Sequence, residues 1–562
     1  MGTRKTGRLS TMKIKGKYFI TGMVLLLLSF HAAAQNCTLT LGIDQNYIVG
    51  SAFNIQPGDV VCFEPGTKNF IQLKDIHGTS DKPITFINKG GVVVINTDHY
   101  FGIKIGNCSH IIFRGDGSSK AEYGFQIKKV TGGAGVSVDD KSTDVELSHL
   151  EISNTAIGGL YAKTDPTCDN YQDVDHDHFT MYNFSFHDSY IHDVADEGMY
   201  IGNSHYTGYT LPGCNTFVYP HSLKGVKVYN NIVENTGWDG IQVSAADSNC
   251  QIYNNRIHFD SQSEAQGQMS GILIGGGSKC KVYNNQITDG KGDGIEVFGL
   301  GNMEIFNNLI VNAGSNYQPG DPSKLKHGIY VGTVTTEQAA ILGIYNNTII
   351  HPKSFGITLT NTQIFKNRII NNLITEPGKF DENGDRAFIN YNISESRFEI
   401  SNNFKTNDNQ AVHFVAPNSG NYDLKGDSPA VNFGTDLSAE GVTFDILNRN
   451  RPFHDYFDAG AFESHDPEAG VANKKASDVK SFTVFPNPAH TVFRIQLELT
   501  QSQHIVIILQ NINGQELFKK TTRVIAGQRL TYPVEISNLA SGAYLLQILS
   551  AHGASNKIVF KK

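Results

Sequence analysis

Acidic and aromatic side chains recur around a series of glycines in the middle of the chain. The residue before each glycine is Glu197, Asp239, Ser270, Asp293, His327 or Phe355. The second residue after each glycine is Tyr200, Gln242, Leu273, Glu296, Tyr330 or Thr358. Carboxyl groups in pairs cleave glycosidic bonds as acid and base or nucleophile. Aromatic rings beside them offer a sugar ring a flat apolar platform.

These residues give two sets of candidates. The predicted catalytic residues are Glu197, Asp239, Asp293, Glu296, His327 and Tyr330, and the predicted substrate-binding residues are Tyr200, Trp238, Gln242 and Lys291. An aspartate before a glycine is also ordinary turn chemistry, so Asp239 and Asp293 taken singly are better explained as structural residues. Glu296 is the most informative, because it lies in mid-strand, where turn chemistry does not apply.

Two sequence patterns that alternate from residue 226 to residue 404 must position these side chains. One is an Asn-Asn pair after an apolar residue, at 230–231, 254–255, 284–285, 307–308, 346–347, 371–372 and 402–403. The other is the glycine followed by a short apolar strand. Strand repeats of twenty to fifty residues without helical periodicity predict an all-β solenoid, a parallel β-helix. The asparagines are then structural, in left-handed turns and in an amide ladder between coils.

The coil spacing sets which residues can act together. Consecutive coils lie about 4.8 Å apart, so outward side chains at equivalent positions are expected to form a shelf along which a polymer can lie. Glu197 and Asp239 on adjacent coils suit a retaining hydrolase, which needs carboxyl groups about 5–5.5 Å apart. Asp239 and Asp293, two coils apart at about 9.6 Å, approach the upper limit for inversion, about 9.5 Å.

A polysaccharide lyase is the other scheme that these residues allow. It requires a base, for which His327, Tyr330 and Lys291 are candidates, and a cation that neutralises the uronate. The acidic cluster would bind Ca²⁺, a hard ion that prefers carboxylate oxygens. A second Ca²⁺ candidate is the acidic insert at 165–179, with Asp173, Asp175 and Asp177 as ligands. Solvated loop acids are the competing explanation for that insert.

Seven cysteines and an export signal indicate an oxidising destination. Cys250 and Cys280 hold equivalent repeat positions, so a disulfide between neighbouring coils is predicted there. Cys37 with Cys62 and Cys168 with Cys214 are further candidate pairs, which leaves Cys108 unpaired.

Residues 1–34 are predicted to be a cleaved signal peptide, with a basic stretch, an apolar run and Ala32-Ala33-Ala34 before Gln35. The apolar run is too short to span a bilayer, so no membrane-spanning segment is expected in the mature chain.

The net charge of −8 and the scattered basic residues give no reason to expect nucleic-acid binding. We expect a monomer.

The last eighty residues carry a series of specific motifs. They include Phe485-Pro486-Asn487-Pro488-Ala489, Asn513-Gly514, the segment 538–546 and the terminal 557–562. In this order they resemble the type A C-terminal sorting domain of the type IX secretion system of Bacteroidetes. The resemblance implies a small β-sandwich at 481–562, the type IX machinery as a partner, and export through the periplasm and outer membrane to the medium or the cell surface.

Motifs at both ends of the repeat resemble right-handed parallel β-helix proteins of the pectin-lyase-like superfamily. They lie at 56–61, 64–66 and 78–86 near the start, and at 428–430, 451–452 and 458–463 near the end. The resemblance covers the predicted β-helix at 35–465, which a linker at 466–480 follows. It implies a polysaccharide-cleaving enzyme, with a lyase slightly favoured because the superfamily contains many. No lyase motif with the usual arginine is present. The alternative is a non-catalytic glycan-binding or adhesive surface protein.

Overall fold

The computed structural model describes residues 36–299, 301–332, 340–360, 366–379, 388–391, 397–453, 456–466, 479–500, 502–511, 515–550 and 553–562. The predicted signal peptide, Asn513-Gly514 and nearly all of the predicted linker lie outside these residues. No helix in the described ranges has the length and apolar character needed to cross a membrane.

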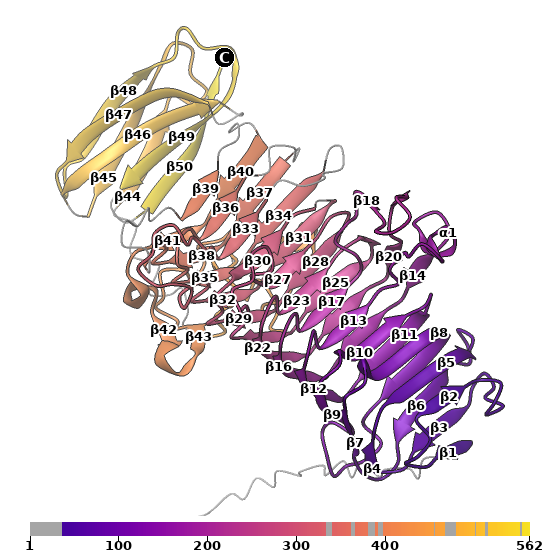
Figure 1. The fold of residues 1–562 in the computed structure, drawn as a ribbon. Coiled ribbons are helices and arrows are strands. Elements are labelled where there is room, and N and C mark those ends of the chain that lie inside the picture. The colour runs from indigo at the N-terminus through magenta and orange to yellow at the C-terminus, as the bar shows by residue number, and fades with distance from the viewer. Residues whose placement is uncertain are drawn as a thin grey trace, which may run out of the picture. The chain divides into compact units, whose positions relative to one another are not determined.

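A parallel β-helix forms most of the described chain, and its strands belong to three stacks (Figure 1). The first stack contains β1 (Leu39–Leu41), β3 (Val60–Phe63), β6 (Ile84–Asn88), β8 (Phe101–Arg114), β11 (Thr143–Ser148), β15 (Ser185–His187), β21 (Lys227–Tyr229), β25 (Cys250–Tyr253), β28 (Cys280–Tyr283), β31 (Met303–Phe306), β34 (Ile341–Tyr345), β37 (Lys366–Ile370) and β40 (Phe398–Ser401).

The second stack contains β4 (Gly66–Lys68), β7 (Val93–Thr97), β9 (Phe125–Val130), β12 (Leu150–Thr155), β16 (Tyr190–Val194), β22 (Ile232–Thr236), β26 (Arg256–His258), β29 (Gln286–Thr288), β32 (Leu309–Val311), β35 (Thr348–Ile350), β38 (Leu373–Thr375) and β41 (Phe404–Thr406). The third contains β2 (Tyr47–Val49), β5 (Ile71–His77), β10 (Ala134–Asp139), β13 (Leu160–Ala162), β17 (Met199–Ile201), β23 (Ile241–Val243), β27 (Ser270–Ile274), β30 (Asp293–Val297), β33 (Ile329–Val331), β36 (Ile357–Leu359) and β39 (Ile389–Tyr391). The long strand β8 contributes its first half to the third stack and its second half to the first.

Inserts and the C-terminal part add smaller elements. Beside the coils lie α1 (Tyr171–Val174), the hairpin of β18 (Tyr209–Thr210) and β19 (Phe217–Val218), and a sheet of β14 (Thr180–Tyr182), β20 (Ser222–Lys224) and β24 (Ala246–Ser248). The segment after the last coil contains β42 (Phe414–Ala416), β43 (Asn421–Leu424) and the 3₁₀ helices η2 (Asn409–Val412), η3 (Pro417–Ser419) and η4 (Ser438–Glu440).

The C-terminal residues form two antiparallel sheets with a hydrophobic core of their own. The first sheet contains β44 (Val479–Phe485), β45 (Val492–Leu499) and β48 (Arg529–Glu535); the second contains β46 (Gln503–Asn511), β47 (Glu516–Val524), β49 (Gly542–Ser550) and β50 (Gly553–Lys561). The predicted fold class, an all-β solenoid followed by a small β-sandwich, is therefore confirmed.

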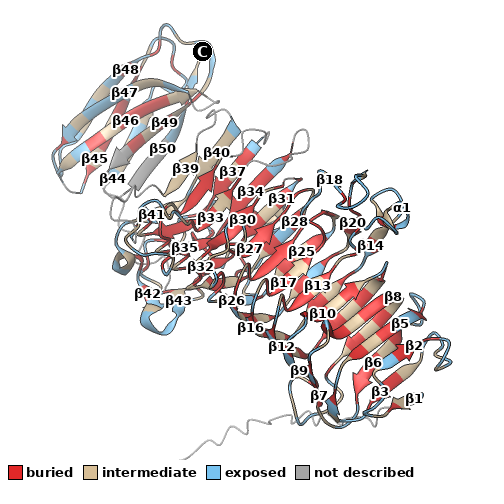
Figure 2. Cartoon of the chain, viewed as in Figure 1, coloured by how far each residue is buried: buried red, intermediate tan, exposed pale blue. Residues whose placement is uncertain are grey.

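Apolar columns fill the β-helix (Figure 2). Ile241 and Ile272 are register partners, and so are Ile272 and Ile295. All three side chains are fully buried. A single coil cannot bury its apolar face alone, so stability comes from contacts between neighbouring coils.

Buried asparagines form a second column. The side-chain Nδ2 of Asn231 donates to Oδ1 of Asn255 at 3.0 Å, and Asn255 donates in the same way to Asn285. The ladder continues through Asn308, Asn347, Asn372 and Asn403. The first asparagine of each pair has a positive φ, for example 56° at Asn254. The structure thus contains both the left-handed turns and the amide ladder predicted from the Asn-Asn repeats.

Three disulfides join the predicted pairs Cys37–Cys62, Cys168–Cys214 and Cys250–Cys280. Cys250 and Cys280 are register partners in β25 and β28, so their disulfide links neighbouring coils. Cys108 is buried and forms no disulfide.

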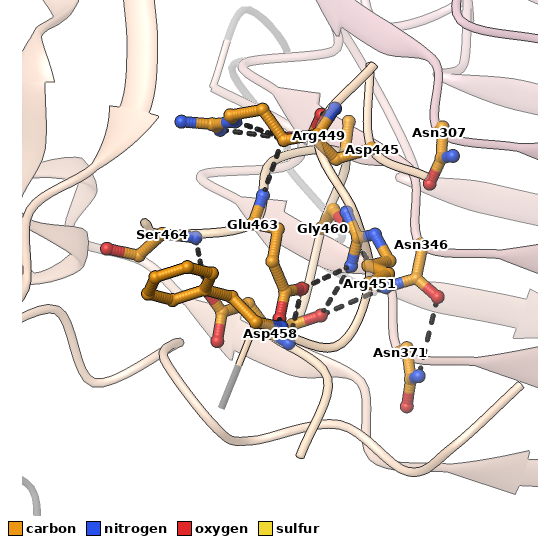
Figure 3. Close-up of polar contacts among 12 residues, drawn as sticks. Asn307, Asn346, Asn371, Asp445, Arg449, Arg451, Asp458, Gly460, Glu463 and Ser464 are labelled. Carbon is orange, nitrogen blue, oxygen red and sulfur yellow. Dashed lines mark hydrogen bonds and ion pairs between the residues drawn. The ribbon is translucent and has the colours of Figure 1, made fainter. Parts of the chain in front are cut away.

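A buried ion pair organises the segment that follows the last coil (Figure 3). Arg451 lies 3.2 Å from Glu463, and its guanidinium also donates to the carbonyl oxygens of Asp458 and Gly460. Those same carbonyls accept hydrogen bonds from Nδ2 of Asn346, which is a turn residue of the Asn-Asn repeat. The motif around 451–463 therefore holds this segment against the coils.

We predict that Asn285→Ala destabilises the β-helix by about 2–4 kcal/mol, because buried partners in two neighbouring coils lose their hydrogen bonds. Trp238 is the single tryptophan, so its fluorescence during urea unfolding reports on the β-helix. Asn418→Ala, at an exposed position, serves as the control. Equal unfolding free energies for the two variants would show that the ladder does not stabilise the fold.

Candidate functional site

The residues that precede the glycines lie above one another in consecutive coils. The amide N–H of Gly198 donates to the carbonyl of Asp239, Gly240 donates to Ser270, and Gly294 donates to His327. Ser270 and Asp293 are register partners. A side chain in place of Gly240 would put Cβ 2.6 Å from the carbonyl oxygen of Gly271, so only glycine fits between these coils.

Ser270 bridges two carboxyl groups at the centre of this row. Its Oγ lies 2.8 Å from Oδ1 of Asp239 and 3.1 Å from Oε2 of Glu296. A hydroxyl group has one proton to donate, so both hydrogen bonds form together only when one of the two carboxyl groups is protonated. The backbone N–H of Ser270 donates a further bond to Oδ1 of Asp239. Ser270, Asp239 and Glu296 therefore form one hydrogen-bonded unit.

Burial keeps several of these carboxyl groups protonated. Burial, together with the carboxylate of Asp293, raises the pKa of Glu296 to about 8. Burial and Asp196 raise the pKa of Glu197 to about 7. Burial and the carboxylates of Glu296 and Glu197 raise the pKa of Asp239 well above its usual range. Desolvation and like charges both disfavour the ionised form, so the row supplies carboxylic acids near neutral pH.

Asp293 differs from its neighbours because a lysine neutralises it. Nζ of Lys326 lies 2.8 Å from Oδ2 of Asp293, and the backbone N–H of His327 donates to Oδ1 at 2.6 Å. Burial favours the neutral amine, but Asp293 and Glu296 raise the pKa of Lys326 above its usual value. Sequence reasoning missed both Lys326 and the bridging role of Ser270. The signal for Lys326 was its place next to His327 in the repeat.

His327 lies between two aromatic rings. Its ring stacks on Tyr330 at 5.5 Å and on Phe355 at 5.3 Å. Nδ1 accepts the backbone N–H of Phe355, so in the neutral ring Nε2 carries the proton. Burial lowers the pKa of His327, which favours this neutral form. His327 can therefore donate a hydrogen bond through Nε2.

The outward residues of the third stack line up in register as expected, but most of them are buried and do not form an open shelf. Gln242 is 1 % exposed and Glu296 7 %, although both point away from the apolar core. Leu273 and Tyr330 are the register partners of Glu296 on either side. We infer that these large side chains, only one coil away, shield the carboxyl group. Asp239 has no exposed surface at all, Glu296 and His327 are each 7 % exposed, and Tyr330 and Phe355 are more exposed than either.

The predicted substrate-binding residues do not form one group. The hydroxyl of Tyr200 bonds to Ser204, and Nζ of Lys163 lies over its ring. Gln242 is buried beside Tyr200 in register. Trp238 is half-buried next to Asp239. Lys291 pairs with Glu264 at 2.7 Å rather than with the carboxyl row.

The predicted metal ligands in the acidic insert also point to separate partners. Asp175 bonds to His178, Asp177 pairs with His176, and Asp173 lies in α1. Over all the described residues, no three or more His, Cys, Asp or Glu side chains are grouped so that they could hold a metal ion.

Two family models match the chain. The model described as a right-handed beta helix region matches residues 216–405, and the model described as a secretion system C-terminal sorting domain matches residues 483–561. A comparison with curated proteins found no match. The sorting domain indicates export by type IX secretion to the cell surface or the medium.

Several solved structures show a distant likeness. Pectate lyase Pel9A is 14 % identical with a TM-score of 0.41, covering 77 % of this chain and 98 % of that one. GH136 lacto-N-biosidase from Eubacterium ramulus is 14 % identical with a TM-score of 0.36, covering 62 % of each chain. The A-module of mannuronan C-5 epimerase AlgE6 from Azotobacter vinelandii is 13 % identical with a TM-score of 0.35, covering 62 % of this chain and 91 % of that one. Similarities this low carry no argument about activity.

The stacked coils, the separate C-terminal sheets and the two family models together show a right-handed parallel β-helix protein with a C-terminal sorting domain of the type IX secretion system.

Proposed function

We propose that this exported protein cleaves glycan chains, with Glu296 as the general acid. The observation that carries the proposal is the Ser270-bridged pair of Asp239 and Glu296. Because burial raises the pKa of Glu296 to about 8, this residue holds a proton at neutral pH and can give it to a leaving glycosidic oxygen. Asp239 is fully buried and acts as a positioning residue through Ser270.

Asp293 is the second carboxyl group that hydrolysis needs. Nζ of Lys326 lies 2.8 Å from its Oδ2, whereas Glu296 accepts from the hydroxyl of Ser270. Two carboxyl groups with unlike environments are the arrangement that acid and base assignments require. The Nε2 proton of His327 is available for a hydrogen bond to a sugar hydroxyl. Hydrolysis of a glycosidic bond is therefore the chemistry that this cluster supports best.

The lyase scheme has less support from the geometry. It needs a base, but Nδ1 of His327 is occupied and Lys291 is paired with Glu264, which leaves Tyr330 as its candidate. Ca²⁺ binding stays a prediction from the sequence. The described side chains do not fit such a site, and no step of this proposal uses the ion.

We predict that Glu296→Gln lowers the rate of glycan cleavage at least about a hundredfold, because the amide cannot donate the proton of the acid. The purified protein is incubated with a panel of neutral and acidic polysaccharides, and new reducing ends are measured. Exposed Glu122→Gln is the matched control and should keep full activity.

The products separate the alternatives. Reducing ends without the ultraviolet absorbance of an unsaturated uronate identify a hydrolase, and reducing ends with it identify a lyase. Binding without any new reducing ends would contradict the proposal in favour of a glycan-binding surface protein. Full activity of Glu296→Gln would remove Glu296 from the chemistry.

A second prediction concerns stability and needs no substrate. Between about pH 4.5 and pH 8 the unfolded chain has Glu296 ionised while the folded chain keeps it protonated. Unfolding then releases a proton, so the contribution of Glu296 to stability falls as the pH rises through this range. Relative to the unmodified protein, Glu296→Gln should therefore gain roughly 2–4 kcal/mol between pH 5 and pH 8.

Urea unfolding followed by Trp238 fluorescence at several pH values measures this difference. Glu122→Gln should leave the pH dependence unchanged. If the Glu296→Gln curve runs parallel to that of the unmodified protein, Glu296 does not hold a proton at neutral pH.

A further inference from the structure

Two inserts form a wall beside the small sheet of β14, β20 and β24. One insert contains α1, the other contains the hairpin of β18 and β19, and Figure 1 shows these elements together at one side of the coils. The disulfide Cys168–Cys214 joins the inserts. The backbone N–H of His176 also donates to the carbonyl of Tyr219. The wall is thus cross-linked by a disulfide and by a main-chain hydrogen bond.

A cleft of about 650 Å³ lies between this wall and the small sheet. Ser222 and Lys224 of β20 and Asp247 of β24 line it from the sheet, and Tyr206 and Tyr219 line it from the inserts. Its volume lies within the range of pockets that bind small ligands. Hydroxyl groups line the cleft together with a weakly associated pair, Lys224 and Asp247, whose charged atoms are 3.9 Å apart. The charged groups of the lining therefore largely balance.

The two tyrosines leave ring surface free for a ligand. Tyr206 packs on the backbone of Gly276 and Gly277, where a Cβ atom on Gly277 would lie 2.2 Å from its ring. Tyr206 packs against this backbone and is still 38 % exposed. Tyr219 is 46 % exposed and touches the ring of His176 edge to face at 5.2 Å. An exposed tyrosine offers an apolar ring face together with a polar hydroxyl, which suits contact with a sugar ring.

We infer that this cleft binds a short segment of glycan, with sugar rings resting on Tyr206 and Tyr219 and hydroxyl groups bonded to Ser222, Lys224 and Asp247. The lining favours an uncharged sugar, because Lys224 and Asp247, which line the cleft from the sheet, pair with each other. Tyr206 follows β17 and Gly276 follows β27, so the cleft lies beyond the C-terminal ends of strands whose N-terminal ends carry the carboxyl row. The inference that the cleft binds glycan depends only on the residues of the cleft. The further step, that the bound glycan extends to Glu296, rests on the proposed function.

The test is affinity electrophoresis of the full chain in gels that contain galactomannan, xylan, mixed-linkage β-glucan, pectin or alginate. We expect at least one neutral polysaccharide to retard the protein. Tyr206→Ala combined with Tyr219→Ala should weaken this binding about tenfold or more. Tyr206→Phe should preserve it, because the ring remains. Tyr100→Ala removes a tyrosine that is 79 % exposed and lies outside the cleft, and it should change nothing.

The outcomes keep this inference apart from the proposed function. Unchanged retardation of the double alanine variant, or no retardation of the unmodified protein by any of the polysaccharides, would overturn the inference. Trp238 fluorescence confirms that the variants are folded. Glu296→Gln should bind as tightly as the unmodified protein while it loses cleavage. Binding that depends on Tyr206 without any cleavage would support the cleft and contradict the catalytic proposal.

Discussion

Main-chain hydrogen bonding between coils in register is the constraint on which the rest of this structure depends. Each parallel strand pairs with the equivalent strand of the next coil, so residues 22 to 42 positions apart in the chain become neighbours, as Leu39 is to Val61 and Phe186 is to Val228. Any side chain repeated at one position becomes a column. Apolar columns fill the interior, and the asparagine column satisfies buried polar groups that the turns would otherwise leave unpaired.

Burial between the coils creates the unusual electrostatics of the carboxyl row. Desolvation is the largest cause of the raised pKa of Glu197, Asp239 and Glu296. Only Asp239 is also affected by carboxylates of other coils, those of Glu296 and Glu197. The charges beside Glu197 and Glu296 are Asp196 and Asp293, which are close to them in the chain. The solenoid therefore favours protonated carboxyl groups mainly because it buries them.

The sequence predicts the features that follow from equivalent repeat positions, but it does not predict which contacts individual long or bulky side chains make. The Asn-Asn pairs and glycines give the coils, the register of the pre-glycine row, and the Cys250–Cys280 disulfide, because each follows from equivalent positions. The role of Lys326 cannot be predicted in this way. Lys326 does not belong to the pre-glycine row, and its long side chain contacts Asp293, which is 33 positions earlier in the chain. The burial of Glu296 cannot be predicted in this way either. Shielding by Leu273 and Tyr330 depends on side-chain size in three dimensions, whereas the strand pattern gives only the outward direction.

The inserts carry what a regular coil cannot provide. A column of stacked rings, such as Tyr229, Tyr253 and Tyr283, covers each ring face with the next ring at 4.9 Å, so only edges remain for a ligand. Free ring faces require residues outside the repeat, and Tyr206 and Tyr219 lie in such segments. Loops of this kind are mobile unless they are cross-linked. The Cys168–Cys214 disulfide restricts the motion of the two inserts in this exported protein. The coils thus place the buried carboxyl groups in one row, while the proposed glycan cleft depends on the irregular segments beside it.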